Sequence, residues 1–168
     1  MSALEIVEAM NSEDKNVAET VKLALPEIAD AVNLIADRLF QGGRLIYVGA
    51  GTSGRLGVMD ASECPPTFGV SPELIQGLIA GGVSALTDEI EGAEDDSIAG
   101  ESVMKNTGVN RKDVVLGLSA SGTTPFVLAA MEYTKQQGSA RIGLACEMDS
   151  VLLKNVDVAI CVPVGPEI

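Results

Sequence analysis

Two short stretches of small and hydroxyl-bearing residues carry the clearest chemical signal in this sequence. The first loop, GAGTSG at residues 49–54, follows an apolar run, and its glycines let the backbone bring N–H groups close to a ligand. Thr52 and Ser53 add hydroxyl donors. A helix that begins near Ser53 would direct its unpaired N–H groups and its positive dipole end into the same space. The pattern predicts that Gly51, Thr52 and Ser53 bind a phosphate or a carboxylate.

The first loop also satisfies the dinucleotide fingerprint G-x-G-x-x-G. A nicotinamide site needs an acidic residue about 20 positions later, at the end of the second strand. The expected second strand, residues 74–80, runs into Gly81 and Gly82 with no carboxylate at its end. A small phosphorylated ligand is therefore favoured over a dinucleotide and over a purely structural turn.

The second loop, SASGTT at residues 119–124, repeats this design. It follows an expected strand at residues 114–118 and precedes an expected helix from Pro125 to Gln137. Because the carboxyl ends of parallel strands meet at one edge of a sheet, both loops are expected to converge on one ligand. The alternative is a hydroxyl-rich cap at the start of a helix.

Composition restricts the class of protein. The chain has 168 residues, of which 46% are hydrophobic, so it is long enough to bury a core. Its net charge of −13 argues against nucleic acid or an anionic membrane as a partner. No apolar run approaches the ~18 residues of a membrane span, and the N-terminus lacks the basic start of a signal peptide, which predicts a cytoplasmic protein.

The chain contains no histidine, which excludes Ser-His-Asp and Cys-His catalysis and most zinc sites. Acid–base chemistry must therefore use Asp, Glu, Lys or Tyr. The three cysteines, Cys64, Cys146 and Cys161, show no C-x-x-C spacing and fit a reducing compartment.

Residues 1–42 are expected to form a helical segment that packs on the domain or on a partner subunit. Ser2 and Glu5 predict a capping box for a helix to about Met10, and Asn11 or Ser12 could cap the next one. The amphipathic pattern continues to residue 39, is split or kinked at Pro26, and ends at Gly42.

Residues 43–168 are expected to form one α/β domain. A brief helix from Arg55 to Glu63 should stop at Pro65 and Pro66, and Val83, Leu86 and Ile90 mark another helix. The expected strands are 45–48, 74–80, 114–118, 142–146 and 158–162. This alternation predicts a doubly wound parallel sheet flanked by helices on both faces.

The two loops together resemble the sugar isomerase (SIS) domain, a parallel α/β module that holds phosphosugars. More narrowly, residues 43–82, the EGAEDD of residues 91–96 and the terminal VGPE resemble the N-acetylmuramic acid 6-phosphate etherase family over nearly the whole chain. The block DASECPPTFGV is too long and irregular for a chance match.

This resemblance implies cleavage of the D-lactyl ether of N-acetylmuramic acid 6-phosphate to N-acetylglucosamine 6-phosphate and D-lactate, in cell-wall sugar recycling. It implies a phosphorylated amino sugar as substrate, a homodimer, and no metal or redox cofactor. It places catalytic roles on Glu63 and Glu94. Substrate binding is expected from the first loop and from Ser119, Ser121, Gly122, Thr123 and Thr124, with Glu167 contacting sugar hydroxyls.

The reaction needs a base for the C2 proton of the opened sugar, an acid for the departing ether oxygen, and donors for the enediolate oxygen. Glu63 suits the acid, because the negative end of its short helix favours a protonated carboxyl. Glu94 suits the base, because it follows Ile90 by four residues and shares its helix face, unless Gly92 ends that helix first. Arg55 either counters the phosphate charge or pairs with Asp60.

The chain departs from the family pattern at three places. Thr123 stands where many members carry Arg, Glu147–Ser150 replaces a more usual Asn-Pro-Gly-Ser turn, and the family continues past Ile168 and begins earlier. Two other functions fit the same pocket: a phosphosugar-sensing regulatory module of the glucokinase-regulator type, and an aldose–ketose isomerase of phosphosugars.

Overall fold

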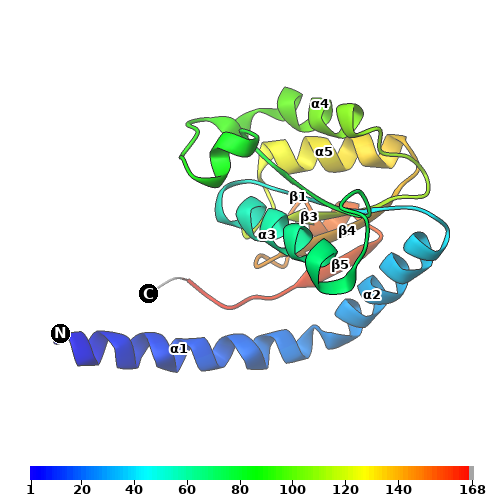
Figure 1. The fold of residues 1–168 in the computed structure, drawn as a ribbon. Helices are drawn as coiled ribbons and strands as arrows, with labels where there is room; N and C mark the ends of the chain where they lie inside the picture. Colours follow the sequence, from blue (N-terminus) through cyan, green and yellow to red (C-terminus); the bar gives the residue numbers. More distant parts are fainter. Residues whose placement is uncertain (167–168) are drawn as a thin grey trace.

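The computed structural model describes residues 1–166 and contains a five-stranded parallel sheet between two layers of helices (Figure 1). The strands are β1 Leu45–Gly49, β2 Ile75–Ile79, β3 Val114–Leu118, β4 Ala140–Ala145 and β5 Val158–Cys161. The helices are α1 Ala3–Leu23, α2 Leu25–Phe40, α3 Gly51–Phe68, α4 Ser97–Thr107 and α5 Pro125–Gln136. Short 3₁₀ turns are η1 Val83–Leu86, η2 Ala93–Asp95 and η3 Leu153–Asn155. The predicted fold class is confirmed.

The strand order is β2-β1-β3-β4-β5, and every neighbouring pair is parallel. The order reverses at β1, which has β2 on one side and β3 on the other. Open α/β sheets bind ligands outside the carboxyl ends of their strands at such a reversal. The fold therefore places the loops that follow β1 and β3 where a ligand is expected.

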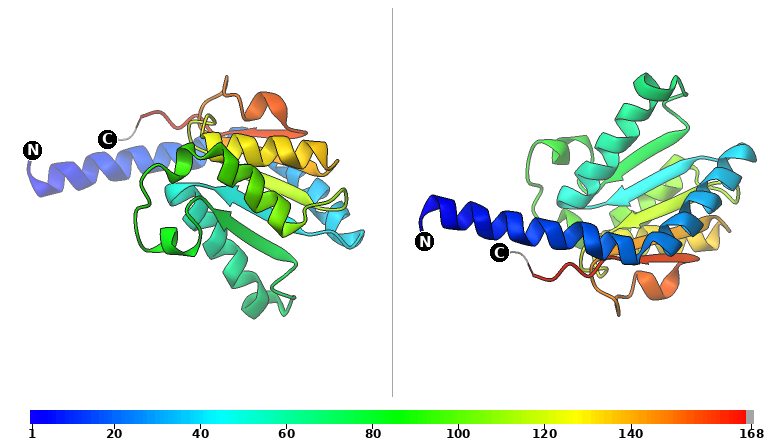
Figure 2. Two further views of the ribbon diagram at one scale, coloured as in Figure 1. Left: turned by 90° about the horizontal axis from the view of Figure 1, so that it is seen from above. Right: turned by 90° about the horizontal axis from the view of Figure 1, so that it is seen from below.

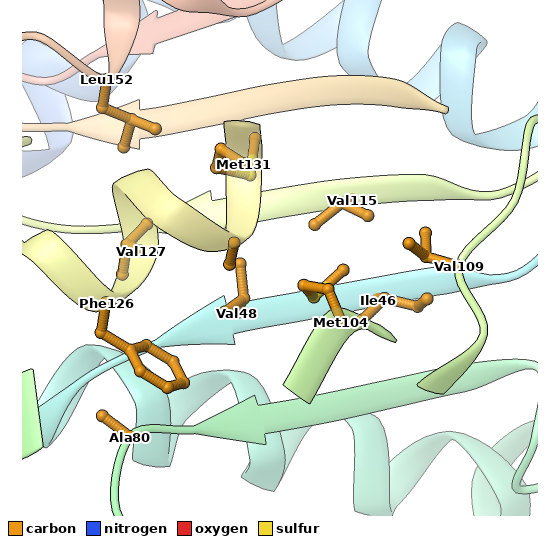
Figure 3. Packing of buried hydrophobic residues seen from close by; sticks show 11 residues of the cluster. Ile46, Val48, Ala80, Met104, Val109, Val115, Phe126, Val127, Met131 and Leu152 are labelled. Carbon is orange, nitrogen blue, oxygen red and sulfur yellow. The ribbon is translucent and has the colours of Figure 1, made fainter. Parts of the chain in front are cut away.

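Alternate residues of β1 point to opposite faces of the sheet, and both faces are covered. Ile46 and Val48 are fully buried beneath α4 and α5, where they pack with Met104 and Phe126 (Figure 3). Leu45 lies in a second buried cluster with residues of α2. Burial on both faces explains why the strands are continuous apolar runs rather than alternating ones.

Helix α1 extends away from the sheet as a single 21-residue helix in which no residue is buried (Figure 2). The Ser2–Glu5 capping box is confirmed. The predicted break at Asn11–Ser12 is wrong, because neither residue interrupts the helix as glycine or proline would. The split at Pro26 is confirmed, with this proline in the first turn of α2. None of the helices within residues 1–166 is long and apolar enough to cross a membrane.

Helix α3 is longer than predicted and runs through Pro65 and Pro66 to Phe68. Both prolines lie in its last turns, so few backbone donors are lost, and Gly69 (φ 67°) ends the helix by donating to the carbonyl of Pro65. Glu63 therefore lies a full turn before the helix end. The argument that the helix dipole suits Glu63 to an acid role is wrong, because that effect is confined to the last turn.

The segment between β2 and α4 is not the predicted helix. It contains only η1 and η2, and Gly92 between them is left-handed (φ 72°), a conformation that cannot continue a helix. The helical phase expected between Ile90 and Glu94 is therefore wrong, and the alternative that Gly92 prevents a continuous helix there is confirmed.

Helix α4 was not predicted from the pattern. Its boundaries do carry sequence signals, because the Asp96 carboxylate accepts from the backbone N–H of Ala99 at 2.8 Å and Gly108 (φ 65°) ends the helix. The acidic run of residues 91–96 obscured this N-terminal cap.

A side-chain hydrogen bond links α3 to β1. The Tyr47 hydroxyl donates to Asp60 Oδ2 at 2.7 Å. Burial of the phenol, together with the Asp60 carboxylate, raises the pKa of Tyr47 above its ordinary value. Because the neutral phenol is favoured in the folded state, this contribution to stability is complete below about pH 10 and is lost as the pH rises further.

We expect Asp60→Asn to lower the pKa of Tyr47, because the substitution removes the negative charge that disfavours tyrosinate. The measurement is a tyrosinate absorbance titration in a Tyr133→Phe background, which leaves Tyr47 as the one tyrosine. Asp37→Asn, which removes an exposed carboxylate on α2, is the matched control and should leave the titration unchanged. An unchanged titration in Asp60→Asn would contradict the linkage.

Candidate functional site

The first loop brings two stretches of backbone into direct contact. A Cβ atom on Gly54 would lie 2.8 Å from the carbonyl oxygen of Gly49 and 2.7 Å from Cγ1 of Ile79, so glycine is required there. This close approach lets α3 begin immediately after the strand, at Gly51 (φ 52°). Within the described chain no side chain caps α3, so its first N–H groups are available to an anion.

The second loop is a network of hydroxyl groups. Ser119 is buried, and its Oγ lies 2.8 Å from Thr124 Oγ1 and accepts from the Gly122 N–H at 3.0 Å. Ser121 Oγ lies 3.0 Å from Thr123 Oγ1. These contacts hold the hydroxyls in a fixed arrangement directly before the first turn of α5.

The two loops leave neighbouring strands at the same level. Gly49 of β1 is paired with Leu118 of β3 in parallel register, so the chain enters both loops from adjacent positions about 4.8 Å apart. Like α3, helix α5 has no side-chain cap in the part of the chain that is described. The prediction that both loops open at one edge of the sheet is confirmed, and α3 and α5 both begin at that edge.

The second loop rests on the turn at residues 147–150, one of the departures from the family pattern. Gly122 (φ 64°) has no room for a side chain, because a Cβ there would lie 2.4 Å from the Oγ and Cβ of Ser150. The Gly122 carbonyl accepts from the Leu152 N–H at 3.0 Å. A change of sequence in this turn therefore acts on the backbone of the second loop.

A cavity of about 330 Å³ opens beside the N-terminus of α3, within the range of small-molecule sites. One side is formed by Gly51, Thr52 and Arg55, and the other by the segment that follows β2. Its lining includes four carboxylates, from Asp88, Glu89, Glu91 and Glu94. The structure therefore brings Glu94 to the same cavity as the first loop.

Other predicted site residues lie outside this cavity. Ser53, the second loop and Glu63 do not line it. Glu63 is exposed on α3, eleven residues beyond Thr52, which places it about 16 Å farther along the helix axis. Glu167 lies outside the described residues.

Arg55 has partners that the sequence did not indicate. Its Nε donates to the carbonyl oxygens of Ala85 at 2.9 Å and Leu86 at 3.2 Å, and its Nη2 donates to that of Asp88 at 3.2 Å. Asp60, one of the two partners considered for Arg55, is bonded to the Tyr47 hydroxyl instead. The guanidinium therefore joins α3 to the opposite wall of the cavity.

The described residues include no group of three or more His, Cys, Asp or Glu side chains arranged to hold a metal ion. Burial raises the pKa of the Cys64 and Cys161 thiols. A raised pKa keeps a thiol protonated and unreactive, which fits structural rather than nucleophilic cysteines.

Comparison with known proteins identifies the family. Residues 27–135 match the family model described as "Glucokinase regulatory protein N-terminal SIS domain". This match covers well over half of the chain and includes both loops. The chain belongs to the SIS-domain family.

This SIS domain has relatives named N-acetylmuramic acid 6-phosphate etherase. It is 50% identical over 168 residues to that of Pasteurella multocida and 52% identical over 167 residues to that of Serratia proteamaculans. The alignments cover 100% and 99% of the chain but 56% of each relative, so the chain spans just over half of their length.

Solved structures share the fold. A phosphoheptose isomerase from Francisella tularensis superimposes with a TM-score of 0.73 at 21% identity, over 97% of this chain and 86% of that protein. At this level of identity the likeness concerns the SIS fold alone.

We expect Gly122→Ala to lower the free energy of unfolding by roughly 1–3 kcal/mol more than Gly138→Ala. Both glycines have positive φ angles, but a Cβ at Gly138 would meet its nearest neighbour, Arg111 Cβ, at an ordinary 3.8 Å. The difference therefore isolates the contact with Ser150, and urea unfolding measures it. The double variant Gly122→Ala/Ser150→Gly should recover part of the loss, and equal losses in the two single variants would contradict the described packing.

Proposed function

We propose that this chain is the phosphosugar-binding domain of an etherase that cleaves the D-lactyl ether of N-acetylmuramic acid 6-phosphate. The products are N-acetylglucosamine 6-phosphate and D-lactate. The observation that carries the proposal is about 50% identity, over the whole chain, to proteins named for this activity. The position of Glu94 beside Gly51 and Thr52 supports it.

The phosphoryl group is held by local donors. The overall charge of −13 repels an anion at long range, so affinity depends on groups in direct contact. The uncapped N-termini of α3 and α5 supply backbone N–H groups and favourable dipole ends. Hydroxyl donors come from Thr52, Ser53, Ser119, Ser121, Thr123 and Thr124.

The chemistry proceeds by elimination and hydration. In the open-chain aldehyde the carbonyl acidifies the C2 proton, which the Glu94 carboxylate removes. The electron pair forms the C2–C3 double bond as the C3–O bond breaks, and Glu63 protonates the leaving lactate oxygen. Water then adds to the double bond at C3, with a proton returned to C2. No step requires histidine, a metal or a redox cofactor.

A homodimer would bring the two glutamates together. Thr52, Leu56, Met59 and Glu63 follow one another at spacings of four, three and four residues, so they share one face of α3. Leu56 and Met59 are large apolar side chains that are more than half exposed. If this face packs antiparallel on the same face of a second copy, a two-fold axis places Glu63 of each copy near Thr52 of the other.

We expect Glu63→Gln to abolish D-lactate release while C2 proton exchange with deuterated water persists. Glu94→Gln should abolish both, because it removes the base. Each loss should be on the order of 10²–10⁴-fold. Glu101→Gln, which changes an exposed carboxylate on α4 away from the cavity, is the matched control and should remain active.

The assay mixes N-acetylmuramic acid 6-phosphate with this chain and, in parallel, with a version extended to the full length of the relatives. Activity in either protein supports the proposal. Absence of lactate from both, with retained binding of hexose phosphates, would contradict the etherase function.

Mixing the two inactive variants tests the shared site. If Glu63 and Glu94 of one site come from different copies, heterodimers of Glu63→Gln and Glu94→Gln contain one intact site. Random re-association should then restore about a quarter of the wild-type rate. If both glutamates of a site come from one copy, the mixture stays inactive.

A second function is a phosphosugar sensor. It is favoured by the match to the domain of a regulatory protein. A sensor would bind hexose phosphates with neither lactate release nor C2 proton exchange, whereas an aldose–ketose isomerase would interconvert sugars without releasing lactate.

A further inference from the structure

We propose that Arg55 is a positioning residue that holds residues 83–95, the segment carrying Glu94, at a fixed separation from the N-terminus of α3. The role of Glu94 in this inference rests on the proposed function, whereas the anchoring of the segment does not.

The segment is anchored by few interactions. Its backbone hydrogen bonds are local, within η1, η2 and the turns beside them. Among residues 1–166, the three bonds from Arg55 are the only hydrogen bonds that connect residues 83–95 to a part of the chain beyond its immediate neighbours. Its apolar packing is limited: Ala85 is buried, and Leu86 and Ala93 are half-buried.

The geometry of these bonds requires a guanidinium. Nε of Arg55 is shared between the carbonyls of Ala85 and Leu86, while Nη2 reaches that of Asp88. A planar fork can satisfy these carbonyls together, whereas a lysine ammonium is a single point on a flexible stem. The carbonyls fix the end of η1 and the turn after it, from which the chain continues along the cavity wall to Glu94.

Among the described residues, Arg55 is also the only basic one that lines this cavity, opposite the carboxylates of Asp88, Glu89, Glu91 and Glu94. A direct contact with the ligand phosphate is therefore the competing role. The two roles differ in what Arg55→Lys would change, since lysine keeps the positive charge and loses the fork.

The test compares Arg55→Lys and Arg55→Ala with wild type. Arg38→Lys is the matched control, because Arg38 Nη1 donates to the Arg111 carbonyl at 2.7 Å and does not line the cavity. Amide hydrogen exchange in the free protein reports on residues 83–95. Calorimetry gives the affinities for inorganic phosphate and for N-acetylglucosamine 6-phosphate.

In Arg55→Lys we expect exchange in residues 83–95 to accelerate at least about tenfold, with β1, β3 and α5 unchanged. Affinity for the phosphosugar should fall about tenfold while affinity for inorganic phosphate stays within about twofold. Arg55→Ala should exceed these effects, and Arg38→Lys should show neither. If Arg55→Ala does not fold, Arg55→Lys decides the test.

Two results would overturn the inference. One is unchanged exchange in residues 83–95, and the other is an equal loss of affinity for phosphate and for the phosphosugar in Arg55→Lys. Exchange in the free protein needs no ligand, so a wild-type chain that binds no phosphosugar would count against the proposed function and leave the anchoring result intact.

Discussion

The parallel pairing of β1 with β3 is the interaction on which the rest of the structure depends. It aligns Gly49 with Leu118, so both loops start from one level at the reversal of strand order. The chain enters α3 directly after β1 and enters α5 after the second loop, so both helices begin at this edge of the sheet. A shift of register by one residue would move buried side chains such as Ile46 and Val115 to the opposite face of the sheet, so core packing fixes the register and thereby the site.

Electrostatics in this site work against the charge of the whole chain. A protein with a net charge of −13 gains nothing from long-range steering of a phosphate, and four carboxylates line the cavity beside α3. In the proposed function, favourable interactions with the phosphate come from short-range donors, namely the helix N-termini and the hydroxyl network around Ser119. The carboxylates must therefore be held at a fixed distance from these donors. The hydrogen bonds of Arg55 to the carbonyls of Ala85 and Asp88, across the cavity, would hold them there.

The positions of the two glutamates connect catalysis to assembly. Glu94 lines the cavity in one chain, whereas Glu63 lies farther along α3 on an exposed face. A shared site in a symmetric pair would account for the exposed apolar residues Leu56 and Met59 on that face. In the proposed function each chain supplies the phosphate-binding elements, and the dimer would supply the acid.

The sequence by itself determined the five strands and the two loops, because apolar runs bounded by glycine and hydroxyl residues depend on local chemistry. It misjudged the length of α3, because a helix tolerates Pro65 and Pro66 only near its end, and the sequence did not show where that end lies. It also predicted a helix after β2, where the chain forms two short 3₁₀ turns with the left-handed Gly92 before the second. Only the tertiary structure decided the partners of Arg55 and the separation of Glu63 from the cavity. Such contacts join residues far apart in sequence, so they cannot be predicted from the spacing of residues along the chain.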